Sequence, residues 1–243
     1  MKKTILASLA LLLFASFKPV DPSSEDPNGD LKYAGRWKSL FDGKTKKGWH
    51  VFRNRSDGSA WKVEEGALTL DPNHKVDGKT AGRGDLITDA SFENYHFVVE
   101  WKVAPKANSG IVFNVQDDAK YEHTWHTGPE MQVLDNDGHS DGKIKTHRAG
   151  NLYDLIAGPD DPVKPVGEWN KAEIILNHGK LELKMNDVTV VTTTMWDDNW
   201  KQMVAKSKFK TKPDFAVFQS GHIGLQDHGD RIWFRNIKVR KLK

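Results

Sequence analysis

A strict alternation of apolar and polar residues is the feature of this 243-residue sequence that most limits its fold. In the run 95–103 (YHFVVEWKV) every odd position is apolar, and Ile111, Phe113 and Val115 repeat the same spacing. The segment 181–185 alternates in the same way. A period of two places successive side chains on opposite faces of a β-strand, so one face is buried and the other is not. The sequence therefore predicts an all-β protein.

Turn residues divide the alternating runs into many short strands. The tetrapeptide 177–180 (NHGK) lies between two such runs and predicts a hairpin, and a last strand begins at Ile232 and runs to the C-terminus. Helical spacing is found at Trp196, Trp200 and Met203, which predicts one short helix over 197–206. Many short strands separated by Gly, Asn and Asp favour a two-sheet sandwich or jelly roll, and periodicity alone does not choose between them.

The N-terminus has the pattern of a secretory signal. Lys2 and Lys3 precede a short apolar stretch over residues 4–17, and we expect cleavage between Ala15 and Val20. An uncleaved membrane anchor is the alternative. We therefore expect a signal peptide over 1–20, a polar leader over 21–30 and a single domain over 31–243, in a protein exported to the periplasm or the medium. The absence of Cys excludes disulfides and a lipid-bearing cysteine.

Charge and composition narrow the class of partner. The formal net charge of +3 falls to about zero once Lys2, Lys3 and Lys18 leave with the signal, so nucleic acid is not an expected partner. The densest basic patch, over 206–212, is predicted to be a solvated surface. Nine Trp exceed what most single domains carry, and they suit both a core and stacking against sugar rings. No further apolar run predicts a membrane span in the mature chain.

The segment 124–136 (TWHTGPEMQVLDN) carries the first candidate site. A strand here would bury Met131 and Val133 and present Glu130 and Gln132 together on the opposite face. That face is either solvated or part of a binding groove.

A second cluster lies in 224–229 (GLQDHG), where Gln226 and His228 share a face. An imidazole can exchange protons near neutral pH, although a hydrogen-bonded surface turn explains the same residues. Asn108, at the start of an apolar strand, could bind sugar hydroxyls or form a turn.

The run 135–141 (DNDGHSD) is rich in oxygen ligands, which makes a divalent cation a candidate cofactor without making any cofactor certain. The serine-hydrolase motif GxSxG, a phosphate-binding glycine loop, the zinc motif HExxH and any cysteine-based site are absent from the sequence.

Taken in order, several motifs resemble the 3-keto-disaccharide hydrolase family over about residues 36–242. They are LFDGKT (40–45) with GW (48–49), WKV (61–63), NSGI (108–111), EMQVLDN (130–136), AGNLY (149–153), GEWN (167–170), GLQDHG (224–229) and FRNI (234–237). The resemblance implies a two-sheet jelly roll similar to the concanavalin A-like lectins and glucanases, in a family of mostly exported bacterial proteins. Asn186-Asp187 departs from a frequent Asn-Gly, and 196–215 is a variable region to which no role transfers.

The family's chemistry implies a site that removes a proton from C2 of a 3-keto-glycoside, expels the group at C1 and adds water. The residues that the resemblance favours as catalytic are Glu130, Asp135 and His228, with the duties of base, acid and proton shuttle left open among them, and with His126 and His147 in reserve. Those favoured for substrate binding are Asn108, Gln132, Tyr153, Gln226, His126 and Trp49, with Trp125 as the alternative stacking residue.

Two other functions fit the same sequence. One is a non-catalytic carbohydrate-binding module on the same fold, since a fold does not fix an activity. The other is a conventional glycoside hydrolase that uses two carboxylates, for which Glu130 and Asp135 would be the pair. A carbohydrate is the expected partner in all three cases, and the oligomeric state stays open.

Overall fold

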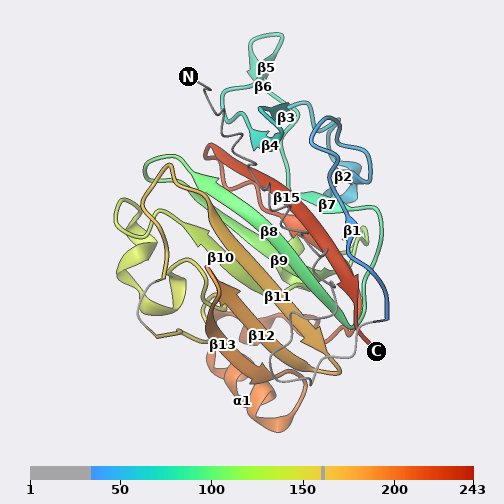
Figure 1. Ribbon diagram of the computed structural model, residues 1–243, viewed down its shortest axis with the longest axis vertical. Coiled ribbons are helices and arrows are strands. Elements are labelled where there is room, and N and C mark those ends of the chain that lie inside the picture. Colours follow the sequence, from blue (N-terminus) through green and yellow to red (C-terminus); the bar gives the residue numbers. More distant parts are fainter. Residues whose placement is uncertain (1–33, 160–161) are drawn as a thin grey trace, which may run out of the picture. The chain divides into compact units, whose positions relative to one another are not determined.

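Two antiparallel sheets bury their apolar faces against each other in the computed structural model, which describes residues 34–159 and 162–243 (Figure 1). The predicted signal peptide and polar leader fall outside the described residues and stay predictions. The strand order within each sheet follows from antiparallel pairing.

Within the described residues the larger sheet has eight strands. Its order is β13 (Val188–Thr194), β12 (Lys180–Met185), β11 (Asn170–Asn177), β8 (Tyr95–Val103), β15 (Ile232–Lys241), β4 (Ala67–Leu70) and β3 (Trp61–Glu64), and β1 (Lys38–Ser39) also pairs with β15.

The smaller sheet has five strands in the part of the chain that the structure describes, and its β9 and β10 lie behind β8 and β11 in the view of Figure 1. Its order is β10 (Glu130–Leu134), β9 (Asn108–Val115), β14 (His222–Leu225), β7 (Leu86–Thr88) and β2 (Trp49–Val51). A separate ribbon pairs β5 (Lys75–Val76) with β6 (Lys79–Thr80). Short 3-10 turns connect the strands: η1 (Phe52–Asn54), η2 (Thr124–His126), η3 (Ser140–Lys143), η4 (Lys145–His147) and η5 (Lys208–Thr211).

The core forms where the apolar faces of the two sheets meet. The odd positions of β8, among them Phe97 and Trp101, pack in one cluster with Phe113 of β9 and Leu225 of β14. Burial of apolar surface is the main free energy that holds the layers together. The predicted all-β, two-sheet jelly roll is confirmed, and the boundaries of β8 are those that the alternation indicated.

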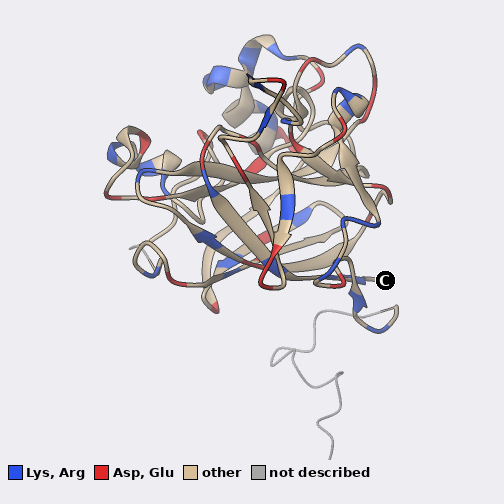
Figure 2. Ribbon diagram, turned by 90° about the horizontal axis from the view of Figure 1, so that it is seen from above, with Lys and Arg blue, Asp and Glu red and all other residues tan. Residues whose placement is uncertain are grey.

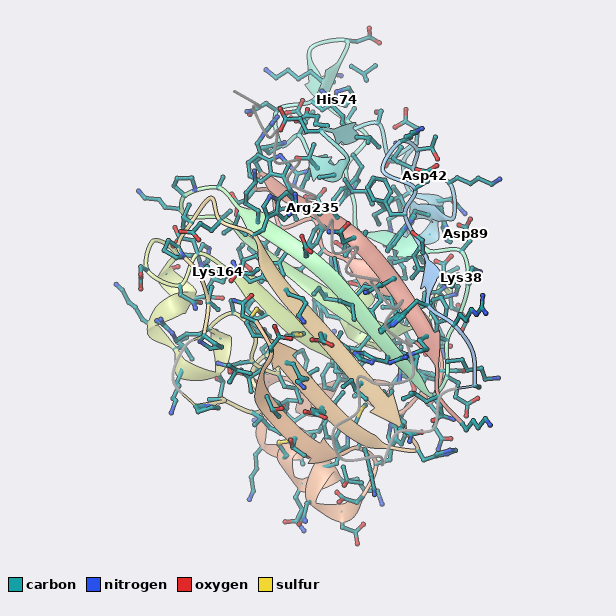
Figure 3. The ribbon with its side chains drawn as sticks, viewed as in Figure 1. Lys38, Asp42, His74, Asp89, Lys164 and Arg235 are labelled. Carbon is teal, nitrogen blue, oxygen red and sulfur yellow. The ribbon has the colours of Figure 1, made fainter. Side chains whose placement is uncertain are left out.

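The outer face of the larger sheet is polar and aromatic. The guanidinium of Arg235 (labelled in Figure 3) lies 3.9 Å from the ring centroid of Trp169, and its Nε donates to Glu100 at 2.7 Å. Lys102 Nζ lies 4.6 Å from the ring centroid of Trp233. Over the described ribbon, basic and acidic residues are interleaved rather than separated into faces of one sign (Figure 2).

Two tight hairpins fix the register of β11, β12 and β13. His178 and Gly179 join β11 to β12 with φ of 46° and 84°, and Asn186 and Asp187 join β12 to β13 with φ of 49° and 69°. Two consecutive left-handed residues are the signature of the type I′ turn, whose twist matches that of the strands. The hairpin predicted at 177–180 is confirmed.

Helix α1 (Asp198–Lys206) follows β13 and covers one end of the sandwich. Asp197 is its N-cap, because its carboxylate accepts a hydrogen bond from the amide of Trp200 at 2.7 Å. Trp200 then packs into the core. This confirms the helix expected over 197–206. Of the helices that the structure describes, none has the length and apolarity needed to cross a membrane.

Replacing the N-cap tests how α1 is held. Asp197→Ala should lower the free energy of unfolding by about 1 kcal/mol, because the amide of Trp200 loses its acceptor. Asp198→Ala is the matched control, since Asp198 is exposed and forms an ion pair with the exposed Lys201. Urea unfolding of both variants measures the difference, and equal losses would show that Asp197 does not cap the helix.

Candidate functional site

The candidate site lies on the outer face of the smaller sheet, opposite the core. In β10, Met131 and Val133 point into the core cluster, whereas Glu130 and Gln132 point away from it into a pocket. The alternation in the sequence therefore correctly separated the two faces of this strand. Both polar side chains are nonetheless buried, with Glu130 only 7% exposed.

Gly110 of β9 makes room for the carboxyl of Glu130. It pairs with Gln132 in the ladder between β9 and β10. A Cβ atom at Gly110 would lie 2.5 Å from the carboxyl carbon of Glu130, which is too close for two non-bonded carbon atoms. Gly110 is needed here because it has no side chain, and not because of its backbone angles. The space that it leaves lets the carboxyl of Glu130 lie over the outer face of the sheet.

The pocket has a volume of about 370 Å³, within the range of small-molecule sites. We call it the polar pocket. It draws on β9, β10, the end of β14, η2, η5 and the loops beside them, and its lining residues are Asn108, Trp125, Glu130, Gln132, Tyr153, Lys208, Phe209, Lys212, Gln226 and His228. Six of the nine residues predicted for the site are in this set, so segments far apart in sequence meet here.

Burial controls the protonation of Glu130. Loss of solvent raises the pKa of its carboxyl to about 8, and the negative charges of Asp85 and Asp141 act in the same direction. The positive charge of Lys208 and a long hydrogen bond of 3.5 Å from Gln226 Nε2 oppose the rise. A carboxyl group that titrates near neutral pH can take or give a proton during a reaction.

Asn108 offers an unused acceptor. Its side chain lines the polar pocket, and its buried Oδ1 has no hydrogen-bond partner in the described structure. A buried polar atom without a partner is costly unless a ligand or water supplies one. The backbone around it is fixed, because Asn108 N donates to Asp230 at 2.9 Å and the neighbouring Ser109 hydroxyl donates to Gln226 O at 2.7 Å.

The loop after η4 covers the free edge of β10. Gln132 N donates to Asn151 O at 3.0 Å, and Tyr153 N donates to Glu130 O at 2.9 Å. An uncovered edge strand would offer its amides and carbonyls to other chains. Here the same pairing places the ring of Tyr153 beside Glu130, where burial and the charges of Asp141 and Glu130 raise the pKa of the phenol.

Lys208 is a site residue that the sequence did not reveal. Its Nζ lies 3.9 Å from the ring centroid of Tyr153, and its backbone amide is held by Asp154 at 2.8 Å. Partial burial lowers the pKa of its ammonium group, while Glu130 and the two nearby aspartates raise it. Lys208, Phe209 and Lys212 belong to a patch predicted to be solvated surface. Most of that patch is exposed, as predicted, but Phe209 is buried and all three residues line the polar pocket. The only hint in the sequence was a Phe between two lysines.

A partly buried acid, Asp85, links two walls of the polar pocket. Asp85 accepts from Asp227 N at 2.9 Å and also from the hydroxyl of Thr124, the first residue of η2. Asp227 in turn forms a paired hydrogen bond with the guanidinium of Arg83. Burial raises the pKa of Asp85. The network holds the strand end that carries Gln226 and His228 against the turn that carries Trp125.

Three predicted residues do not line the polar pocket. Asp135 accepts backbone hydrogen bonds from Lys106 at 2.6 Å and Gly138 at 2.9 Å, so its carboxylate closes a turn. Trp49 packs in the core, and its Nε1 donates to Leu40 O at 2.7 Å, which leaves no face for a sugar.

His126 lies behind the pocket wall. Its Nε2 is 3.2 Å from Lys212 Nζ, and its ring meets that of Trp125 at 4.5 Å between centroids. His147, held in reserve, is bonded through Nε2 to Asp154 at 3.1 Å and packs on Tyr153. Both histidines therefore support residues that line the pocket.

The oxygen-rich loop over 135–141 does not gather into a metal centre. Across residues 34–159 and 162–243, no three or more His, Cys, Asp or Glu side chains come together as ligands for an ion.

The fit between Gly110 and Glu130 can be tested by a double-mutant cycle. Gly110→Ala should lower the free energy of unfolding by about 1–3 kcal/mol, because the new methyl group displaces the carboxyl. In a Glu130→Ala background the same change should cost much less, since the clashing atoms are gone. Gly35→Ala is the control, because nothing lies within 4 Å of its added Cβ. Equal costs in both backgrounds, measured by urea unfolding, would contradict the account.

The protonation of Glu130 has a signature in stability. Because the folded pKa of about 8 lies above the ordinary 4.5, the folded protein keeps a proton that the unfolded chain releases, and stability falls as pH rises between these values. Relative to Glu130→Gln, the wild type should lose a few kcal/mol of unfolding free energy between pH 4.5 and 8 and change little above pH 9. If the difference in unfolding free energy between the wild type and Glu130→Gln stays constant from pH 4.5 to 8, the raised pKa of Glu130 is refuted.

Comparison with known proteins agrees with this geometry. Residues 36–240 match the family described as the 3-keto-alpha-glucoside-1,2-lyase-like domain. The chain is 34% identical over 225 residues to a 3-keto-disaccharide hydrolase of Bacteroides thetaiotaomicron, covering 84% of this chain and 78% of that protein.

Solved structures show the same fold. A protein of Parabacteroides distasonis, provisionally assigned as a glycosyl hydrolase, superimposes with a TM-score of 0.76 at 27% identity over 85% of this chain and 94% of that one. The laminarinase of Rhodothermus marinus, at 11% identity and a TM-score of 0.50 over 88% of this chain and 98% of its own, shares the sandwich alone. The match over nearly all of the described residues and the curated relative together show that the chain belongs to the 3-keto-alpha-glucoside-1,2-lyase-like family.

Proposed function

We propose that this protein is a hydrolase that cleaves 3-keto-glycosides in the polar pocket. Membership of the family supports a carbohydrate hydrolase, and the curated relative that carries the name 3-keto-disaccharide hydrolase supports the oxidised sugar as substrate. The observation that carries the proposal is the burial of the Glu130 carboxyl in a pocket that Lys208 also lines. This burial raises the pKa of the carboxyl to about 8.

The proposed reaction has two stages. The ketone at C3 acidifies the proton at C2, so a base removes it and the electron pair moves onto the C3 oxygen as an enolate. The enolate re-forms the ketone and a C1–C2 double bond as the C1–oxygen bond breaks, and the leaving oxygen takes a proton. Water then adds to C1, and C2 recovers a proton. Each stage requires a base, an acid and a positive group near the C3 oxygen.

Glu130 is the base in this proposal. A carboxylate whose pKa lies near 8 is a stronger base than an ordinary one, and it still loses its proton close to neutral pH. Its position at the floor of the pocket, next to Gly110, leaves one side of the carboxyl facing the space where a sugar would lie.

The other lining residues supply the remaining duties. The ammonium group of Lys208, an exposed residue that lines the pocket, would stabilise the enolate oxygen, because a positive charge attracts a developing negative charge. Asn108, whose side chain lines the polar pocket, would hydrogen-bond a sugar hydroxyl. His228, at the exposed rim, would pass a proton to the leaving oxygen.

The two rival functions fit the pocket less well. A conventional glycosidase needs a second carboxyl facing the first across about 5–10 Å. Glu130 is the only Asp or Glu among the described residues that line the polar pocket, and Asp135 is occupied in its turn. A pure binding module is disfavoured by the family match and by the curated relative named as a hydrolase. Export to the periplasm or the medium, inferred from residues 1–20, is part of the proposal as well.

The test compares a glycoside with its 3-keto form. Wild-type protein should release product only from the 3-keto form, with loss of a C2 deuterium label and with kcat/KM rising through an apparent pKa of about 8. Glu130→Gln should reduce kcat by about 10²–10⁴-fold, whereas Glu168→Gln, an exposed control, should not. Cleavage of the unoxidised glycoside, or full retention of the label, would overturn the proposal.

A further inference from the structure

A second pocket adjoins the polar pocket. It lies between α1 and the segment that follows η5, and its volume is about 450 Å³. We call it the apolar pocket. Two Trp and two Phe side chains line it together with smaller apolar ones, and no motif of the sequence assigned it a role.

The two pockets share a wall. Phe209 and Lys212 line both of them. The ring of Phe209 stacks on that of Phe215 with centroids 3.8 Å apart and planes 6° from parallel. The two pockets are therefore immediate neighbours, with Phe209 and Lys212 between them.

Strained backbone holds one side of the apolar pocket in shape. Trp196 and Ala216 both have left-handed backbones, with φ of 70° and 56°. This conformation costs about 1–2 kcal/mol for a residue with a Cβ atom. The indole Nε1 of Trp196 donates to Ala216 O at 2.9 Å, and Ala216 N donates to Thr127 O at 2.7 Å beside η2. These two hydrogen bonds fix the position of the Trp196 ring on the wall of the apolar pocket.

The lining selects against a sugar and in favour of an aromatic acid. Its charged residues are Lys201, Lys210 and Lys212, and it contains no Asp or Glu among the described residues. Sugar hydroxyls need acceptors as well as donors, but lysine only donates, and Gln219 is the one side chain of the lining with a carbonyl acceptor. Flat apolar walls with positive charges at the edge instead suit an aromatic ring that carries an anionic oxygen.

We propose that the apolar pocket binds an aromatic group bearing a carboxylate or phenolate oxygen, and that in the substrate this group is the part that leaves from C1. The assignment of this aromatic group to the leaving group at C1 rests on the proposed function, because the keto sugar must then occupy the polar pocket. The binding of an aromatic group with an anionic oxygen is inferred from the shape and charge of the apolar pocket alone.

The test places a negative charge at the rim of the apolar pocket. Val217 lines it and is 50% exposed, so Val217→Glu should fold normally. Ala205→Glu, on the exposed side of α1, repeats the test from the opposite rim. Val188→Glu is the matched control, since Val188 is 44% exposed on β13 and lines neither pocket.

Two readouts separate the parts of the proposal. Calorimetric titration with 2-naphthoate should show binding that both rim variants weaken at least tenfold and that Val188→Glu and Glu130→Gln leave unchanged. The ratio of kcat/KM for a carboxyphenyl 3-keto-glucoside over a 3-keto-disaccharide should fall at least tenfold in the rim variants.

The outcomes are distinguishable. Absence of 2-naphthoate binding, or binding that the rim variants leave intact, overturns the inference. Binding that the rim variants abolish supports the aromatic ligand even if no 3-keto-glycoside is cleaved, in which case the proposed function alone fails. An unchanged kcat/KM ratio despite weakened 2-naphthoate binding overturns the assignment of this pocket to the leaving group.

Discussion

The site depends on the close contact between the carboxyl group of Glu130 and the backbone of Gly110. Glu130 turns over the outer face of the smaller sheet because Gly110, on the neighbouring strand, leaves that space empty. The sheet below it and the loop carrying Tyr153 beside it exclude water from the carboxyl. Removal of water, more than any single charge, places its pKa near neutral. The geometry of two strands thus sets the chemistry of one acid.

The walls around this acid come from segments that the chain brings together only in three dimensions. The Asp85 network ties the end of β14 to η2, and the pairing of the loop at Asn151 with β10 adds Tyr153. Helix α1 leads into η5, which contributes Lys208 and Phe209. A rigid sandwich carrying adaptable loops is a frequent way in which one fold supports different chemistries.

Local pattern was enough to predict the layers and part of the site. Alternation gave the limits of β8 and the outward direction of Glu130 and Gln132, because both are properties of a strand by itself. The role of Asp135 as a turn residue was also within reach, since Asp followed by Asn-Asp-Gly is typical of a side chain that bonds its own backbone.

Long-range contacts were beyond such reasoning. Trp49 was predicted to stack on a sugar, but its ring is buried in the core and its Nε1 donates to Leu40 O. The exposure of Lys208 was predictable, but its place in the lining of the polar pocket depends on η5 lying near β10 in the fold. Neither the period of the strands nor the composition predicts which segments, far apart in the sequence, come into contact.

The protonation of Glu130 in the free protein is the central claim, and NMR reads it directly. Glutamate labelled with ¹³C at the carboxyl carbon, with the Glu130 signal assigned by its loss in Glu130→Gln, should show a titration midpoint of about 8. A midpoint at the ordinary value near 4.5 would mean that water reaches the carboxyl, and the account of the site would be contradicted.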